Sequence, residues 1–207
     1  MLSVALRRSL SVMMLLPTSV ALAGPLAFDP TGIPQFTGSV AFNASNQLLV
    51  DLDYAVFAPG VYPDDGVNGD DPSNGAEYVY AYQAFNRTAS TRALTTVSVG
   101  LVNDQTGAHN AVPDPLHVLT GGVLPSSMEV NLVSLSVITR FLNPPVPAGG
   151  YSSVFLFTSP NRPTYMTTSV LSGGLVDTQM APSPLPEPAT FGLLALGGLV
   201  VLRRRRA

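Results

Sequence analysis

Two stretches, VDLDYAVF (50–57) and EYVYAYQAF (77–85), decide the fold that this sequence predicts. In the first, apolar side chains alternate with Asp51 and Asp53, so one face of an extended strand is apolar. In the second, two sets of side chains alternate: Tyr78, Tyr80 and Tyr82 on one face, and Val79, Ala81 and Phe85 on the other. A period of two with many β-branched and aromatic residues is typical of strands. Both stretches are therefore predicted to be β-strands.

The same period recurs in further segments, which are 36–42, 95–102, 129–141, 151–159 and 164–171. Segments rich in glycine, proline, asparagine and aspartate separate them, as expected of turns. The region 24–180 contains no apolar stripe of period 3.6. We therefore expect one all-β domain over 24–180, an antiparallel β-sandwich of the jelly-roll or immunoglobulin-like kind with seven to nine strands. Residues 181–185 (APSPL) are expected to form a proline-rich spacer.

Charge and cysteine content narrow the function classes. The formal net charge of the 207-residue chain is −3, but residues 24–184 hold four arginines against twelve acidic residues. Nucleic-acid binding depends mainly on cations that neutralise phosphates, so the acidic domain is not expected to bind nucleic acid. The chain has no cysteine, which excludes a disulfide framework, a thiolate metal site and a cysteine nucleophile.

The N-terminal residues have the layout of a secretory signal peptide. Two arginines and an apolar run (10–16) precede Ala21 and Ala23, which are the small residues at −3 and −1 of a signal-peptidase site. Cleavage would leave Gly24 as the first residue, so 1–23 is predicted to be removed. An uncleaved N-terminal anchor is the alternative.

The C-terminal residues predict a membrane segment of unusual form. Residues 188–202 are apolar and would form a helix of about 22 Å, which is short for a hydrocarbon core of about 30 Å. Four consecutive arginines follow and would remain on the cytoplasmic side: Arg203, Arg204, Arg205 and Arg206. Together with the signal peptide, this transmembrane helix places the predicted domain outside the inner membrane.

The order of a short motif, an apolar helix and an arginine cluster resembles the PEP-CTERM sorting signal of exported bacterial proteins, which is also labelled "ice-binding protein C-terminal domain". The matching residues are Pro186, Glu187 and Pro188, then 189–202, then 203–206. The resemblance implies that an exosortase-type enzyme recognises the signal, processes it near the motif, and transfers the protein to the cell surface or releases it. It covers only 186–207 and assigns no activity to the central domain. An ordinary C-terminal anchor is the alternative.

The loop YPDDGVNGDDPSNG (62–75) is the segment with the most candidate metal ligands. It offers a cluster of oxygen ligands of the kind that calcium prefers: Asp64, Asp65, Asn68, Asp70 and Asp71. Their spacing does not match an EF-hand loop, and no glutamate closes it. A solvated hairpin loop is the plainer interpretation. No cofactor is expected, and calcium at this loop is the alternative.

Other candidate groups are weaker. His109 and His117 flank Asp114, which would suit a metal site or an acid–base pair, but surface loop residues are the simpler interpretation. Glu77 and Glu129 each lie at a strand start, and nothing in the sequence shows that they converge as a glycosidase pair. The sequence contains no nucleophile-elbow, zinc-protease or phosphate-loop motif.

The three tyrosines at 78, 80 and 82 would either stack against carbohydrate or pack inside the domain. The sequence thus predicts an exported, non-catalytic protein of the cell surface or extracellular matrix, with an exosortase-type enzyme and the inner membrane as partners. A carbohydrate- or calcium-binding module on the same sorting signal is the alternative, with extracellular polysaccharide as the partner.

Overall fold

The computed structural model describes residues 25–63, 71–104, 106–114 and 122–186. These residues form two short 3-10 helices and ten β-strands. The helices are η1 (Pro25–Phe28) and η2 (Pro34–Phe36). The strands are β1 (Thr37–Ala44), β2 (Leu48–Phe57), β3 (Tyr78–Asn86), β4 (Thr96–Gly100), β5 (His109–Asp114), β6 (Ser127–Asn131), β7 (Ser136–Arg140), β8 (Val154–Ser159), β9 (Pro163–Ser172) and β10 (Leu175–Pro184).

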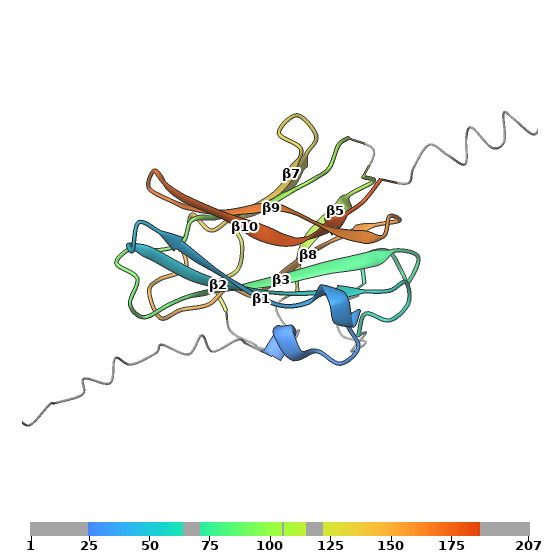
Figure 1. Cartoon of the computed structure of the whole chain (residues 1–207), viewed down its shortest axis with the longest axis horizontal. Coiled ribbons are helices and arrows are strands. Elements are labelled where there is room, and N and C mark those ends of the chain that lie inside the picture. Colours follow the sequence, from blue (N-terminus) through green and yellow to red (C-terminus); the bar gives the residue numbers. More distant parts are fainter. Residues whose placement is uncertain (1–24, 64–70, 105, 115–121, 187–207) are drawn as a thin grey trace, which may run out of the picture.

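The strands form two five-stranded antiparallel sheets that lie one on the other (Figure 1). The first sheet has the order β1-β2-β3-β8-β5, and the second has the order β10-β9-β4-β7-β6. The expected all-β class and the antiparallel two-sheet architecture are confirmed. The described strands number ten rather than seven to nine, because the prediction missed β5 and β10 and treated β6 and β7 as one segment.

The main core lies between the two sheets and receives Val50, Leu52 and Val56 from the alternating residues of β2. Tyr80 and Tyr82 of β3 lie there and stack against Phe157 and Phe155 of β8. The second sheet contributes its own inward side chains to this core: Val97, Val99, Val137, Val170 and Ala181. Removing these apolar groups from water is the main source of stability for such a sandwich.

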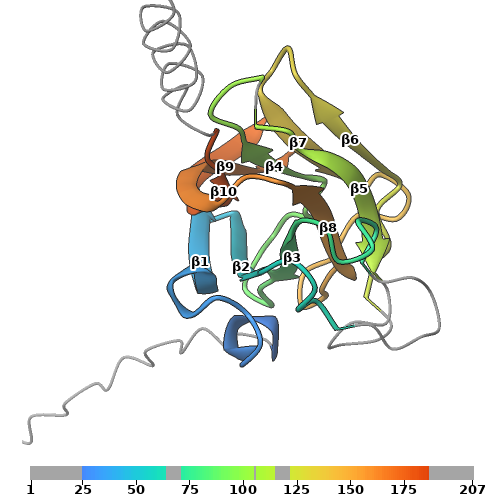
Figure 2. The ribbon, with the colours of Figure 1, turned by 90° about the vertical axis from the view of Figure 1, so that its right-hand side faces the viewer.

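The outer face of the first sheet is also covered, which the sequence pattern did not indicate. Leu26 of η1 and Tyr62 pack onto it with Val79 and Leu156, and all four are buried. Figure 2 shows η1 below this sheet, on the side away from the second sheet. The centre of the first sheet, formed by β3 and β8, is therefore buried on both faces.

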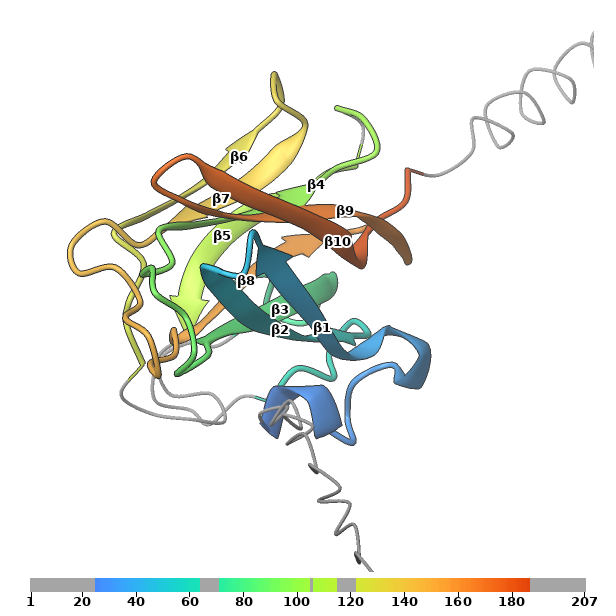
Figure 3. The same cartoon turned by 60° about the vertical axis from the view of Figure 1, so that its left-hand side comes forward.

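The predicted segment 129–141 is a hairpin rather than one strand. β6 ends at Asn131, whose side-chain oxygen accepts hydrogen bonds from the backbone N–H groups of Val133 and Ser134. Such an Asx turn reverses the chain locally. β7 then pairs with β6 along its whole length. Figure 3 shows this hairpin at the edge of the second sheet.

The expected spacer 181–185 is instead largely the end of β10. This strand pairs with β9 as far as Pro184, and Ala181 to Pro184 are buried. β10 is an edge strand, where prolines are tolerated because no neighbouring strand needs their missing N–H groups. Gly173 and Gly174, both with positive φ, form the tight two-residue turn from β9 to β10. The domain therefore extends at least to Pro184.

Candidate functional site

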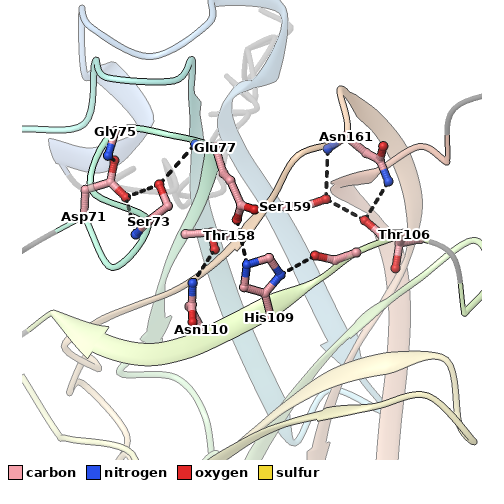
Figure 4. A network of polar contacts seen from close by, with 11 residues as sticks. Asp71, Ser73, Gly75, Glu77, Thr106, His109, Asn110, Thr158, Ser159 and Asn161 are labelled. Atoms are coloured by element: carbon pink, nitrogen blue, oxygen red, sulfur yellow. Dashed lines mark hydrogen bonds and ion pairs between the residues drawn. The ribbon is translucent and has the colours of Figure 1, made fainter.

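The described part of the predicted calcium loop is held by its own hydrogen bonds. Asp71 Oδ1 accepts from the backbone N–H (2.8 Å) and the hydroxyl (2.7 Å) of Ser73, and Asp71 Oδ2 accepts from the N–H of Gly75 (3.1 Å). The Ser73 hydroxyl oxygen in turn accepts from the N–H of Glu77 (3.1 Å). Figure 4 shows this chain of contacts. Both carboxylate oxygens of Asp71 thus shape the turn that leads into β3.

The other four candidate ligands fall outside the described residues: Asp64, Asp65, Asn68 and Asp70. Within the ranges that the structure describes, no three or more histidine, aspartate or glutamate side chains gather in a way that would hold a metal ion. The calcium hypothesis stays a prediction.

Glu77 and His109 form an ion pair across the end of β8 (Figure 4). Glu77 precedes β3 and His109 begins β5, and β8 lies between these strands. The distance from Glu77 Oε2 to His109 Nε2 is 2.9 Å, and His109 Nδ1 lies 2.6 Å from the carbonyl oxygen of Gly107. Each ring nitrogen of His109 therefore lies close to an oxygen atom, one from Glu77 and one from Gly107. The pair fastens the edge strand β5 to the sheet.

A third contact supports the same attachment of β5. Asn110 donates from Nδ2 to the hydroxyl oxygen of Thr158 on β8 (3.1 Å). Thr158 is paired with His109 on one side and with Val79 on the other. The ion pair and the Asn110 contact therefore act on the same end of β5, beside a register irregularity between His109 and Val112.

The two described residues of the predicted histidine–aspartate group, His109 and Asp114, are not brought together. His109 and Asp114 stand at opposite ends of β5, about 16 Å apart along an extended strand. Asp114 is buried and accepts a hydrogen bond from the hydroxyl of Tyr62 (2.7 Å). His117 lies outside the described residues. The interpretation of His109 as a loop residue was wrong, because it belongs to a strand.

A second polar cluster, which the sequence did not reveal, ties the β8–β9 turn to the segment before β5. Ser159 donates from its hydroxyl to the carbonyl oxygen of Thr106 (2.5 Å), and Asn161 Nδ2 donates to the same oxygen (2.8 Å). The backbone N–H of Asn161 donates to the Ser159 hydroxyl oxygen (3.1 Å). Tyr80 donates from its hydroxyl to the carbonyl oxygen of Asn161 (2.7 Å). The residues joined by these hydrogen bonds are far apart in the sequence, so no short sequence pattern indicates the cluster.

The tyrosines do not form an exposed surface for carbohydrate. Tyr80 and Tyr82 are fully buried, and Tyr78 is partly buried against the core. Burial raises the pKa of Tyr82 and of Tyr80 well above the ordinary value, because an ionised phenol would lose its hydration. The Tyr82 hydroxyl donates to the carbonyl oxygen of Pro182 (2.5 Å) and so links β3 to β10 in the opposite sheet. The stacking hypothesis for these tyrosines was wrong.

The two glutamates at strand starts do not converge. Glu77 is paired with His109 in the first sheet, whereas Glu129 lies on β6 in the second and forms an ion pair with Arg140 (2.9 Å). The hydrogen bond from Arg140 lowers the pKa of Glu129. Each carboxylate therefore has a local structural partner.

The predicted sorting and cleavage residues lie almost wholly beyond the described residues. Pro186 is the last residue described, and the backbone N–H of Leu185 donates to the carbonyl oxygen of Arg162 (2.7 Å). The rest fall outside the description: Ala21, Ala23, Gly24, Glu187, Pro188, the helix 188–202 and Arg203, Arg204, Arg205 and Arg206. Among the described residues, no helix has the length and apolar character needed to cross a membrane.

Comparisons with known proteins add no relative. No protein-family model matches this chain, and the searches of curated proteins and of solved structures gave no match.

Proposed function

We propose that this protein is an exported, non-catalytic component of the cell surface or extracellular matrix, delivered through a PEP-CTERM-type signal that an exosortase-type enzyme processes. The observation that carries the proposal is the place where the last described strand, β10, ends. β10 is paired as far as Pro184, and the predicted motif begins at Pro186. In the sequence, the motif, the apolar segment and the arginines follow the end of this strand in the order that the sorting signal has.

The polar groups of the domain support a structural role. The carboxylate of Glu77 and the ring of His109 contact each other and the backbone of Gly107. The hydroxyls of Tyr80 and Tyr82 hold backbone carbonyl oxygens inside the molecule. A catalytic or binding group must be able to contact a substrate, whereas Tyr80 and Tyr82 are fully buried and use their hydroxyls to hold strands and turns in place.

The experiment is cell fractionation of the full chain and two variants. Glu187→Ala should leave membrane insertion intact and prevent processing, so that full-length protein collects in the membrane fraction. Deleting Arg203–Arg206 should remove the cytoplasmic stop, so that uncut protein passes through the membrane. The matched control is Glu129→Ala, which removes an exposed carboxylate on β6, at the opposite edge of the sheet from β10, and should be processed like the wild type. Equal processing of Glu187→Ala and the wild type would reject the proposal.

A further inference from the structure

We propose that the outer edge of β6 is a self-association surface, at which a second copy of this chain adds its own β6 in antiparallel orientation about a two-fold axis. The inference goes beyond the proposed function and does not depend on how the chain is exported. It starts from the edges of the two sheets, because an edge strand presents unpaired N–H and C=O groups with which another chain can pair. The described sheets have four edge strands: β1, β5, β10 and β6.

Three of these edges carry features that oppose such pairing. β1 and β10 lie on the same side of the sandwich (Figure 2), where the backbone N–H of Asn43 on β1 donates to Asp177 Oδ2 on β10 (2.6 Å). β10 also contains Pro182 and Pro184, and β5 contains Pro113 beside a register irregularity. Prolines, bulges and cover by another part of the chain are the usual means by which native proteins block an edge.

β6 has none of these features. It contains no proline, and it pairs with β7 residue by residue without a register shift. Its one charged side chain, Glu129, forms an ion pair with Arg140 of β7 in the same sheet (2.9 Å). Alternate residues of β6 direct their N–H and C=O groups away from β7. Figure 2 shows β6 at the margin of the second sheet, on the side away from β10. Of the four described edges, the edge of β6 is therefore the one best suited to accept another strand.

Exposed apolar side chains lie at both ends of β6. The turn that follows its last residue carries Leu132 and Val133, and Val133 is 97% exposed. Leu124 precedes its first residue, and Leu142 lies at the same end, where its N–H donates to the Ser126 hydroxyl oxygen (3.0 Å). The three leucines are each more than half exposed. Removing such side chains from water is favourable, so both ends of β6 are suited to contact an apolar partner.

An antiparallel two-fold pairing brings these two ends together, because the turn of one copy lies beside the start of β6 in the other. Only a register centred on a residue keeps the inward side chains of both copies on one face. A centre at Met128 places Leu132 opposite Leu124 of the second copy, and Glu129 opposite Ser127 of the second copy. A centre at Glu129 would place two like charges opposite each other, which is unfavourable. Each copy thus supplies both halves of the apolar contact, as an isologous dimer requires.

Charges placed at the apolar ends should weaken the dimer without unfolding the domain. Val133→Lys and Leu124→Lys each put an ammonium group where the second copy would exclude water, and each change enters the dimer twice. Burial of one such side chain changes an equilibrium constant by about 10-fold or more, so each variant should raise the dissociation constant at least that much. The matched control is Val176→Lys on β10, a comparably exposed apolar residue at the opposite edge of the same sheet.

Sedimentation of the full chain in detergent, over a concentration series, measures the association. The wild type and Val176→Lys should form dimers, whereas Val133→Lys and Leu124→Lys should be monomeric at concentrations where the wild type is dimeric. A wild type that is monomeric throughout would overturn the inference. A dimer of equal stability in Val133→Lys and Val176→Lys would overturn it as well.

The register is tested with introduced cysteines, since the chain has none of its own. Ser127→Cys and Glu129→Cys, mixed and mildly oxidised, should give a disulfide-linked dimer of the two variants, because directly opposite residues are close enough to be bridged and diagonal ones are not. Each variant alone should be linked far less. Thr178→Cys on the β10 edge is the control and should stay unlinked. Linking of Glu129→Cys alone as fast as in the mixture, or equal linking of Thr178→Cys, would overturn the proposed pairing.

Discussion

At the scale of single residues, two arginine–carboxylate pairs among the described residues differ in burial. Arg87 donates to both oxygens of Asp51 (2.8 and 2.5 Å), and the Asp51 side chain is only 5% exposed. This hydrogen bonding raises the pKa of Arg87 further. The Arg140–Glu129 pair lies at the surface, where solvent screens the attraction.

Arg87→Ala should therefore destabilise the domain strongly, because it leaves the carboxylate of Asp51 buried without its cation. We expect a loss of about 2–3 kcal/mol in the free energy of unfolding, less than for a fully buried pair since Arg87 is partly exposed. Arg140→Ala is the matched control and should leave the urea midpoint nearly unchanged. Similar midpoints for the two variants would contradict the assigned role of Asp51.

The buried tyrosines should make the free energy of unfolding fall at alkaline pH. The ordinary tyrosine pKa is 10.0, and burial raises that of Tyr80 and Tyr82, while burial and then a hydrogen bond with Tyr165 raise that of Tyr54 to about 12. Above pH 10 the unfolded chain loses these protons and the folded chain keeps them. Stability should be fully present below pH 10 and fall above it, by about 1.4 kcal/mol per pH unit for each of Tyr80 and Tyr82.

This dependence is checked by a pH titration that follows two signals: tyrosine absorbance at 295 nm, which reports ionisation, and near-ultraviolet circular dichroism, which reports tertiary structure. We expect part of the seven tyrosines to titrate near pH 10 and the buried ones to ionise only as the tertiary signal disappears. Complete titration of all tyrosines near pH 10 with the fold intact would show that Tyr80 and Tyr82 are not buried.

Residue-level prediction succeeded where the signal is local. The alternation in 77–85 correctly separated Tyr80 and Tyr82 from Val79 and Ala81. The alternation could not show that Val79 and Ala81 are buried as well. Leu26 and Tyr62 cover these two residues, and both lie outside the predicted strands. Hydrogen bonds such as that from Tyr82 to Pro182, a hundred residues apart, leave no trace in a sequence window.

At the scale of elements, η1 is part of the domain although it precedes every strand. Leu26 is fully buried against the first sheet, whereas Phe28 in the same helix is 73% exposed. Leu26→Ala should lower the free energy of unfolding by about 2–4 kcal/mol. Phe28→Ala should change it by less than about 0.5 kcal/mol. Chemical denaturation of both variants checks this, and equal effects would remove η1 from the folded unit.

The last strand gives a second test at this scale. A chain that stops at Pro186 keeps all of β10, while one that stops at Met180 loses Ala181 from the core and leaves the Tyr82 hydroxyl buried without its acceptor. The shorter chain should be at least about 2 kcal/mol less stable in urea. Equal stability would restore the interpretation of 181–185 as a spacer.

β5 and β10 were not predicted from the sequence, for a shared physical reason. β5 begins with His109 and contains Pro113, and β10 ends with two prolines, so neither has the composition of a typical strand. Both are edge strands, where such residues are tolerated. The hairpin at 129–141 was read as one strand because its turn, around Val133, is apolar and does not break the alternation.

At the scale of the whole molecule, the two-layer architecture followed from composition and periodicity alone, since many short alternating segments without helical stripes leave few other folds. The strand order did not, because it depends on pairings such as β3 with β8 that cross most of the chain. The proposed sorting depends on the order and the charge of residues at the two ends of the chain.

Intact-mass analysis of the protein recovered from the cell surface and the medium tests the proposed export and processing most directly. We predict a mature species that begins at Gly24 and ends near Pro186–Pro188, so that it lacks 191–207 with its four arginines. A surface species that still carries Arg203–Arg206 would contradict processing at the motif and leave an ordinary anchor, and a species that begins at Met1 would contradict signal cleavage as well.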